Sequence, residues 1–168
     1  VNVHRLWRTD QLDLADSLLI HSWYEIDIPR SDWIGAVTID EKKSNRLYVV
    51  YASGIQGTQN SDERPGLVYQ LKYKKQRQQP KREIDVSRNL NFGFTGRYNI
   101  ASDGQGGYFL GTRQGIFYGS KKTMKGKRNW VKIGFNTPHC KVHGIHYHQE
   151  KKILTVAYYG RGVWRYYF

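Results

Sequence analysis

Residues 153–168 read ILTVAYYGRGVWRYYF, two runs of apolar and aromatic residues joined by Gly160, Arg161 and Gly162. β-branched and aromatic residues favour strands, and glycine permits the positive φ that tight turns require. This stretch therefore predicts a β-hairpin whose second strand begins at a glycine.

The same order of elements occurs three times along the chain. Glycine-led strands are expected to start at Gly66, Gly115 and Gly162, and so recur after 49 and 47 residues. Each follows an apolar run, at 47–52, 108–110 and 153–159. A repeat of about fifty residues with four short strands is typical of β-propeller blades. An immunoglobulin-like sandwich lacks such repetition, and the strands of a membrane barrel would alternate more strictly.

The sequence thus predicts an all-β chain: a β-propeller segment of about three four-stranded antiparallel blades in an incomplete ring. Residues 1–28 are expected to end one blade, residues 33–86 and 97–135 to form two full blades, and residues 142–168 to form a last blade lacking its fourth strand. The polar residues 41–46 are expected to be a turn, and Gly115 and Gly162 to take positive φ.

Both end blades of this scheme are incomplete, and unpaired strand edges attract other strands. We therefore expect these edges to be covered by the remaining blades of a larger propeller or by a second copy of the chain. Two copies would place about six blades in one ring, which is a permitted number.

Charge points to an acidic partner. The 168 residues contain 27 Lys and Arg but 14 Asp and Glu, a formal net charge of +13. Such a balance favours nucleic acid, an acidic glycan, an acidic protein surface or an anionic membrane surface as a partner. Cys140 is the only cysteine, which excludes an internal disulfide and a cysteine-based zinc site. No apolar run is long enough to cross a membrane as a helix.

Two basic clusters are candidates for a polyanion-binding patch. The repeat places them in the same connection, between the third and fourth strands, of adjacent blades, so we expect them side by side on the outer rim of one face. The alternative interpretation is a pair of solvated loops that keep the protein soluble. The candidate residues are Lys72, Lys74, Lys75, Arg77, Lys81, Arg82, Lys121, Lys122, Lys125, Lys127 and Arg128.

Other candidate residues carry less specific patterns. Phe92, Phe94 and Arg97 occupy a connection between blades, where they are candidates for stacking on a ligand. His146 and His148 alternate on one face of an expected strand and are weak metal-ligand candidates, with solvated histidines as the alternative. No carboxylate pair has the character of a glycosidase site, so no catalytic residue is assigned and no cofactor is expected.

Residues 159–165, YGRGVWR, and the connection from Ser120 to Trp130 carry a family resemblance. The chain from residue 23 onward resembles the C-terminal blades of Asp-box (BNR-repeat) β-propellers, the superfamily of sortilin-like receptors, sialidases and xyloglucan-type glycosidases. The Asp box itself is altered: Ser120, Gly126 and Trp130 are kept, but the aspartate is absent and residues are added.

The resemblance and the charge leave three functions open. The first is a non-catalytic interaction module that binds a protein or a glycan in a secreted or cell-surface assembly. The second is the C-terminal part of a glycoside hydrolase of this propeller type, with the catalytic acids in other blades. The third is binding of polyanions or nucleic acid by the basic loops, which salt-dependent affinity alone would not distinguish from general electrostatic attraction.

Overall fold

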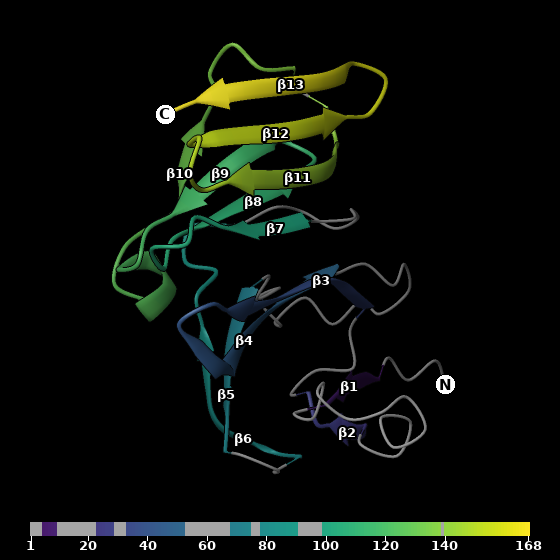
Figure 1. The fold of residues 1–168 in the computed structure, drawn as a ribbon, viewed down its shortest axis with the longest axis vertical. Coiled ribbons are helices and arrows are strands. Elements are labelled where there is room, and N and C mark those ends of the chain that lie inside the picture. The colour runs from purple at the N-terminus through teal and green to yellow at the C-terminus, as the bar shows by residue number, and fades with distance from the viewer. Residues whose placement is uncertain are drawn as a thin grey trace.

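The strands that the structure describes form four antiparallel sheets that follow one another in chain order (Figure 1). The structure is a computed structural model, and it describes residues 5–9, 23–28, 33–52, 68–74, 78–90, 99–138 and 140–168. Within those ranges the one helical element is a single 3-10 turn, η2 (Thr123–Lys125). The predicted all-β fold, a propeller-like segment whose sheets do not close into a ring, is confirmed.

The strand order matches the predicted repeat. The first sheet pairs β1 (Leu6–Arg8) with β2 (Tyr24–Ile26). The second contains β3 (Trp33–Asp40), β4 (Lys43–Ala52), β5 (Val68–Tyr73) and β6 (Pro80–Asp85). The third contains β7 (Asn99–Ser102), β8 (Tyr108–Thr112), β9 (Gly115–Gly119) and β10 (Val131–Ile133). The last contains β11 (Val142–His148), β12 (Ile153–Tyr158) and β13 (Gly162–Tyr167).

Glycine conformation and hydrophobic pattern explain why these hairpins form. Gly115 and Gly162 begin β9 and β13 with φ of 108° and 75°, as predicted, because a side chain resists those angles. Every residue of β8 is buried, as expected for a strand covered on both faces. The predicted turn at 41–46 is wrong in extent: the turn is confined to Glu41 and Lys42, and β4 begins at Lys43. Pairing of Asp40 with Lys43 continues the ladder through these polar residues.

Consecutive sheets pack face to face through separate hydrophobic cores. The first strand of the third sheet, β7, lies beside both β3 and β11, so the first strands of three sheets are neighbours. One core joins the second and third sheets and contains Tyr48, Tyr108 and Leu110. Another joins the third and last sheets and contains Phe109, Val142 and Leu154. Alternation along β8 therefore sends successive side chains into two different cores.

The connection between β9 and β10 fills the space between the second and third sheets. It carries Met124 on η2 and Trp130 just before β10, both almost fully buried. The Trp130 indole Nε1 donates a hydrogen bond to the Val86 carbonyl at 2.8 Å, and Asn89 bonds the Trp130 backbone. This connection occupies the position that the resemblance gives to the Asp box, and here it packs one sheet against the next.

Candidate binding pocket between the third and last sheets

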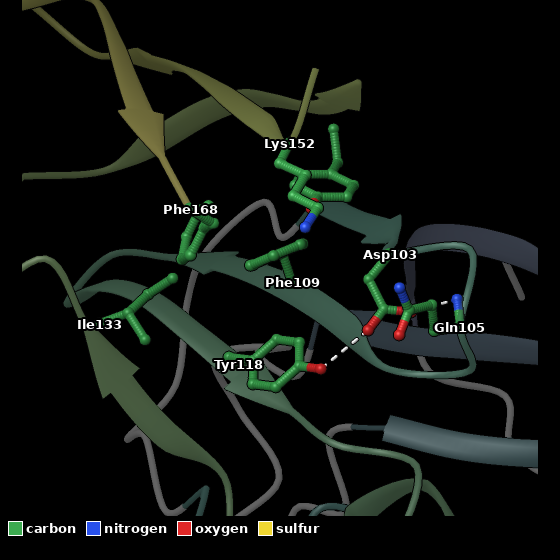
Figure 2. A pocket seen from close by; sticks show the side chains of 8 residues that line it. Asp103, Gln105, Phe109, Tyr118, Ile133, Lys152 and Phe168 are labelled. Atoms are coloured by element: carbon green, nitrogen blue, oxygen red, sulfur yellow. Dashed lines mark hydrogen bonds between the residues drawn. The ribbon is translucent and has the colours of Figure 1, made fainter. Parts of the chain in front are cut away.

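A cavity of about 400 Å³ opens between the third and last sheets (Figure 2). This volume lies within the range of small-ligand sites in proteins. Aromatic rings form its wall, and a carboxylate, an amide and an ammonium group stand at its rim. The lining residues are Asp103, Gln105, Phe109, Tyr118, Ile133, Tyr147, Lys152 and Phe168.

Phe109 is the centre of the aromatic wall. It is the cross-strand partner of Tyr118, and the two ring centroids are 5.1 Å apart. The Tyr147 ring of β11 lies 4.9 Å from Phe109, and the Phe168 ring that follows β13 lies 5.6 Å from it. These tilted rings pack with the geometry that aromatic pairs favour. The wall is therefore assembled from both sheets, while Phe168 keeps 60% of its surface exposed.

Asp103 organises the rim through the turn that joins β7 to β8. Its Oδ1 accepts the backbone N–H groups of Gln105 at 2.7 Å and Gly107 at 2.8 Å. Its Oδ2 accepts the Tyr118 hydroxyl at 2.8 Å, the bond drawn across the pocket in Figure 2. Burial, and then this bond to a carboxylate, raise the pKa of Tyr118 to about 12. The hydroxyl therefore stays protonated at neutral pH and holds the aromatic wall to the turn.

The turn between β11 and β12 supplies the opposite rim. The Phe168 backbone N–H donates to the Lys152 carbonyl at 3.1 Å, which fixes the last ring beside the turn. From the same turn, the Gln149 side-chain amide donates to the Glu41 carboxylate at 2.9 and 3.0 Å. The turns that follow β3, β7 and β11 therefore meet on one face of the molecule, and the pocket lies at that face.

The predicted basic residues that the structure describes lie on or beside β5 and β6 and on the connection between β9 and β10. Lys74, Lys81 and Arg82 are exposed, and Lys72 is half-buried, on β5 and β6 or directly after them. Lys75 and Arg77 lie outside the described residues. All five cations of the second cluster are exposed on the connection between β9 and β10: Lys121, Lys122, Lys125, Lys127 and Arg128.

The structure describes only one of the two other candidate groups. Phe92, Phe94 and Arg97 lie outside the described residues, so stacking there stays a prediction. His146 is exposed on β11, and the His148 Nδ1 accepts the Lys151 backbone N–H at 3.3 Å. Within the described ranges, no three His, Cys, Asp or Glu side chains are grouped closely enough to hold a metal ion.

The pocket itself was not predicted from the sequence. Aspartate is a common turn residue, and the strand periodicity places Phe109 and Tyr118 in strands. The alternation of β8 would have shown that Phe109 lies on the opposite face from Tyr108 and Leu110, but not which sheet that face meets. No local sequence pattern predicts that Phe168 contacts Phe109, because that contact joins two sheets.

Comparison with known proteins adds no family assignment. No protein-family model matches the sequence, and no curated protein matches it. In the part of the chain that the structure describes, no helix combines the length and hydrophobicity of a membrane-spanning segment.

Proposed function

We propose that the protein is a non-catalytic binding module of the Asp-box propeller type and that its pocket takes a glycan. The observation that carries the proposal is the combination at one cavity of four aromatic rings and three polar side chains. Sugar rings present apolar C–H faces together with hydroxyl groups. Aromatic surfaces receive the first, and a few directional polar groups receive the second.

The hydrogen bonds of Asp103 support a role in positioning rather than in acid catalysis. Its oxygens already accept three hydrogen bonds from Gln105, Gly107 and Tyr118. A carboxylate offers about four acceptor sites, so one direction remains for a ligand hydroxyl. Gln105 and Lys152 add a neutral amide and a cation on either side of the same opening.

The proposal includes the assembly in which the module works, a secreted or cell-surface one with further strands beside the last sheet. On β13, Val163 and Tyr167 are 67% and 73% exposed, and β13 pairs with β12 alone among the described strands. The backbone groups on its other side can accept a further strand. We expect that strand to come from the remaining blades of a larger propeller or from a second copy, which native mass spectrometry would detect.

Two neighbouring aromatic residues provide the test of the pocket. Both Phe168 and Tyr167 are exposed, but Phe168 lines the pocket and Tyr167 does not. Calorimetric titration with a panel of neutral oligosaccharides is expected to find a binder whose affinity Phe168→Ala lowers about three- to tenfold, the loss of one aromatic contact. Tyr167→Ala is expected to leave that affinity unchanged.

Two results would contradict the proposal. One is a panel in which no oligosaccharide binds the wild-type chain. The other is equal weakening by Phe168→Ala and Tyr167→Ala, which would show that the exposed aromatic surface of the last sheet binds sugars without selectivity.

A further inference from the structure

Three cations stand in one row across the second sheet. In the strand register Arg46 on β4 is opposite Lys72 on β5, and Lys72 is opposite Arg82 on β6. Residues directly opposite one another on neighbouring strands project from the same face, with Cβ atoms about 4.5–5.5 Å apart. Lys72 is therefore placed between two arginines in the register of the sheet, an arrangement that the two clusters in the sequence do not show.

This row is under-neutralised by the protein. Arg46 forms an ion pair with Asp40 at 3.1 Å, and both side chains are mostly buried, 19% and 10% exposed. Within the described residues, Lys72 and Arg82 have no carboxylate at ion-pair distance. Like charges directly opposite each other destabilise a sheet. A bound anion between Lys72 and Arg82 would remove that repulsion.

The connection between β9 and β10 brings a second set of cations to the same face. The Gln70 side-chain amide donates to the Met124 carbonyl at 2.8 Å. A Cβ built on Gly126 would lie 3.9 Å from Cγ2 of Ile84. Gln70 and Ile84 are paired and are each two residues from Lys72 and Arg82, so they form the adjacent row on that face. Exposed Lys125 and Lys127 flank Gly126, whose Cβ would lie 3.8 Å from the Asp85 carbonyl oxygen, and so lie next to the row of Gln70 and Ile84.

The basic connection also approaches the turn that supplies Asp103 and Gln105 to the pocket. The side chain of Lys121 lies 3.6 Å from the position that a Cβ on Gly106 would take. Gly106 directly follows Gln105, which lines the pocket. The connection therefore carries cations both to the turn that holds Gln105 and to the row formed by Gln70 and Ile84.

We infer that Lys72, Arg82, Lys125 and Lys127 form an anion-binding surface for a glycan that carries sulfate or carboxylate groups. Single-stranded nucleic acid sites combine cations with aromatic rings on which bases stack. Tyr48 and Tyr108, the rings at this end of the interface, are 2% and 1% exposed and are not available for stacking. The assignment to a glycan rests on the proposed function of the adjoining pocket, whereas the anion-binding surface itself does not.

The experiment compares two charge-matched double variants of the 168-residue chain. Lys72→Gln/Arg82→Gln removes two cations from the row, and Arg161→Gln/Arg165→Gln removes two exposed cations from the last sheet. The probe is a heparin octasaccharide, titrated at several salt concentrations. The row variant is expected to lose affinity on the order of tenfold and to lower the salt slope by about 1–2, as expected for lost ionic contacts. The control variant is expected to lose less than about twofold.

A second double variant tests the same surface if the first one is destabilised. If Lys72→Gln/Arg82→Gln shifts the thermal unfolding midpoint, Lys125→Gln/Lys127→Gln replaces it, because both lysines are exposed on the connection. Equal losses in either of these variants and in Arg161→Gln/Arg165→Gln would overturn the surface, since attraction would then follow net charge alone. Tighter binding of single-stranded DNA of equal charge through the same residues would overturn the assignment to a glycan.

The pocket and the anion-binding surface can fail separately. If Phe168→Ala abolishes binding of a neutral oligosaccharide but the row variants bind heparin normally, the surface is wrong and the proposed function stands. If the row variants lose heparin and no oligosaccharide depends on Phe168, the proposed function is wrong and the surface stands.

Discussion

Two successive interfaces between sheets differ in how completely they are filled. Between the second and third sheets, Met124 and Trp130 enter the core from the connection between β9 and β10. Between the third and last sheets, the core stops at Phe109 and leaves a cavity of about 400 Å³ at the rim. The same third sheet serves both interfaces, so its strands alone do not decide which one is filled.

The difference lies in the connection rather than in the strands. Trp130 fills its space and also satisfies polar groups, since its indole donates to Val86 and its backbone bonds Asn89. Between the third and last sheets, the neighbouring turns contribute Asp103, Gln105 and Lys152. These side chains line the rim of the cavity and do not fill it. A large buried side chain supplied by a connection closes an interface, whereas polar turns leave room for a ligand.

Removing Trp130 should have the largest effect on stability. Trp130→Ala deletes a side chain that is 2% exposed and leaves the Val86 carbonyl without its indole donor. The expected loss is about 3–5 kcal/mol of unfolding free energy, measured by urea denaturation. Trp164→Ala, at a residue 41% exposed, should cost only about 1 kcal/mol. Similar losses in both variants would refute the distinction between a filled core and an exposed sheet.

Adding a methyl group at the interface between the third and last sheets should lower the stability less than removing Trp130. A Cβ on Gly111 would collide with the Val142 side chain across that interface, so Gly111→Ala forces β8 and β11 apart. We expect a loss of about 1–3 kcal/mol in thermal or urea unfolding. Gly144→Ala is the matched control, because its Cβ would meet Ala157 at an ordinary 3.8 Å. If Gly111→Ala were as stable as Gly144→Ala, the packing of β8 against β11 would be looser than described.

Replacing the glycines that start β9 and β13 should show a backbone cost that does not depend on packing between the sheets. Gly115→Ala and Gly162→Ala place a side chain at φ of 108° and 75°, and each is expected to lose roughly 1 kcal/mol or more. Space is not the cause, since a Cβ on Gly162 would have no neighbour within 4 Å. A crystal structure of either alanine variant with an unchanged turn and unchanged stability would remove this explanation.

Tyr118 should give the smallest effect, and one that depends on pH. Tyr118→Phe removes the donor to Asp103 while keeping the ring, and is expected to cost about 1 kcal/mol at pH 7. Because the folded pKa of Tyr118 is raised from 10 to about 12, its contribution is complete below pH 10 and is lost as the pH rises from 10 towards 12.

Urea titrations at pH 8, 10 and 11 measure that dependence. Burial raises the pKa of Tyr48, Tyr73, Tyr108 and Tyr166 as well. Ionisation of these four residues should therefore also destabilise the wild-type chain above pH 10. Tyr118→Phe should therefore decline less steeply than the wild type. Identical slopes would show that the Tyr118 hydroxyl is not held by Asp103.

Strand order was predictable because strands and repeats produce periodic patterns in the sequence. The recurring glycines and apolar runs predicted the order of β3 to β13, and the positive φ of Gly115 and Gly162 follows from a local backbone requirement. The predicted strand start at Gly66 lies outside the described residues. The polar start of β4 was mispredicted because residues 43–46 have turn chemistry. Pairing with the adjacent strands β3 and β5 overrides that local preference.

The sequence by itself determined the sheets, their hairpins and the excess of positive charge, because period-two patterns, glycine and net charge are properties of short segments. Only the tertiary structure decided that Phe168 meets Phe109, that Tyr118 bonds Asp103, and that Arg46, Lys72 and Arg82 share one row. Each of these arrangements depends on strand register or on the approach of two sheets. Register and sheet packing are fixed by the combined burial of many side chains, and no local segment encodes them.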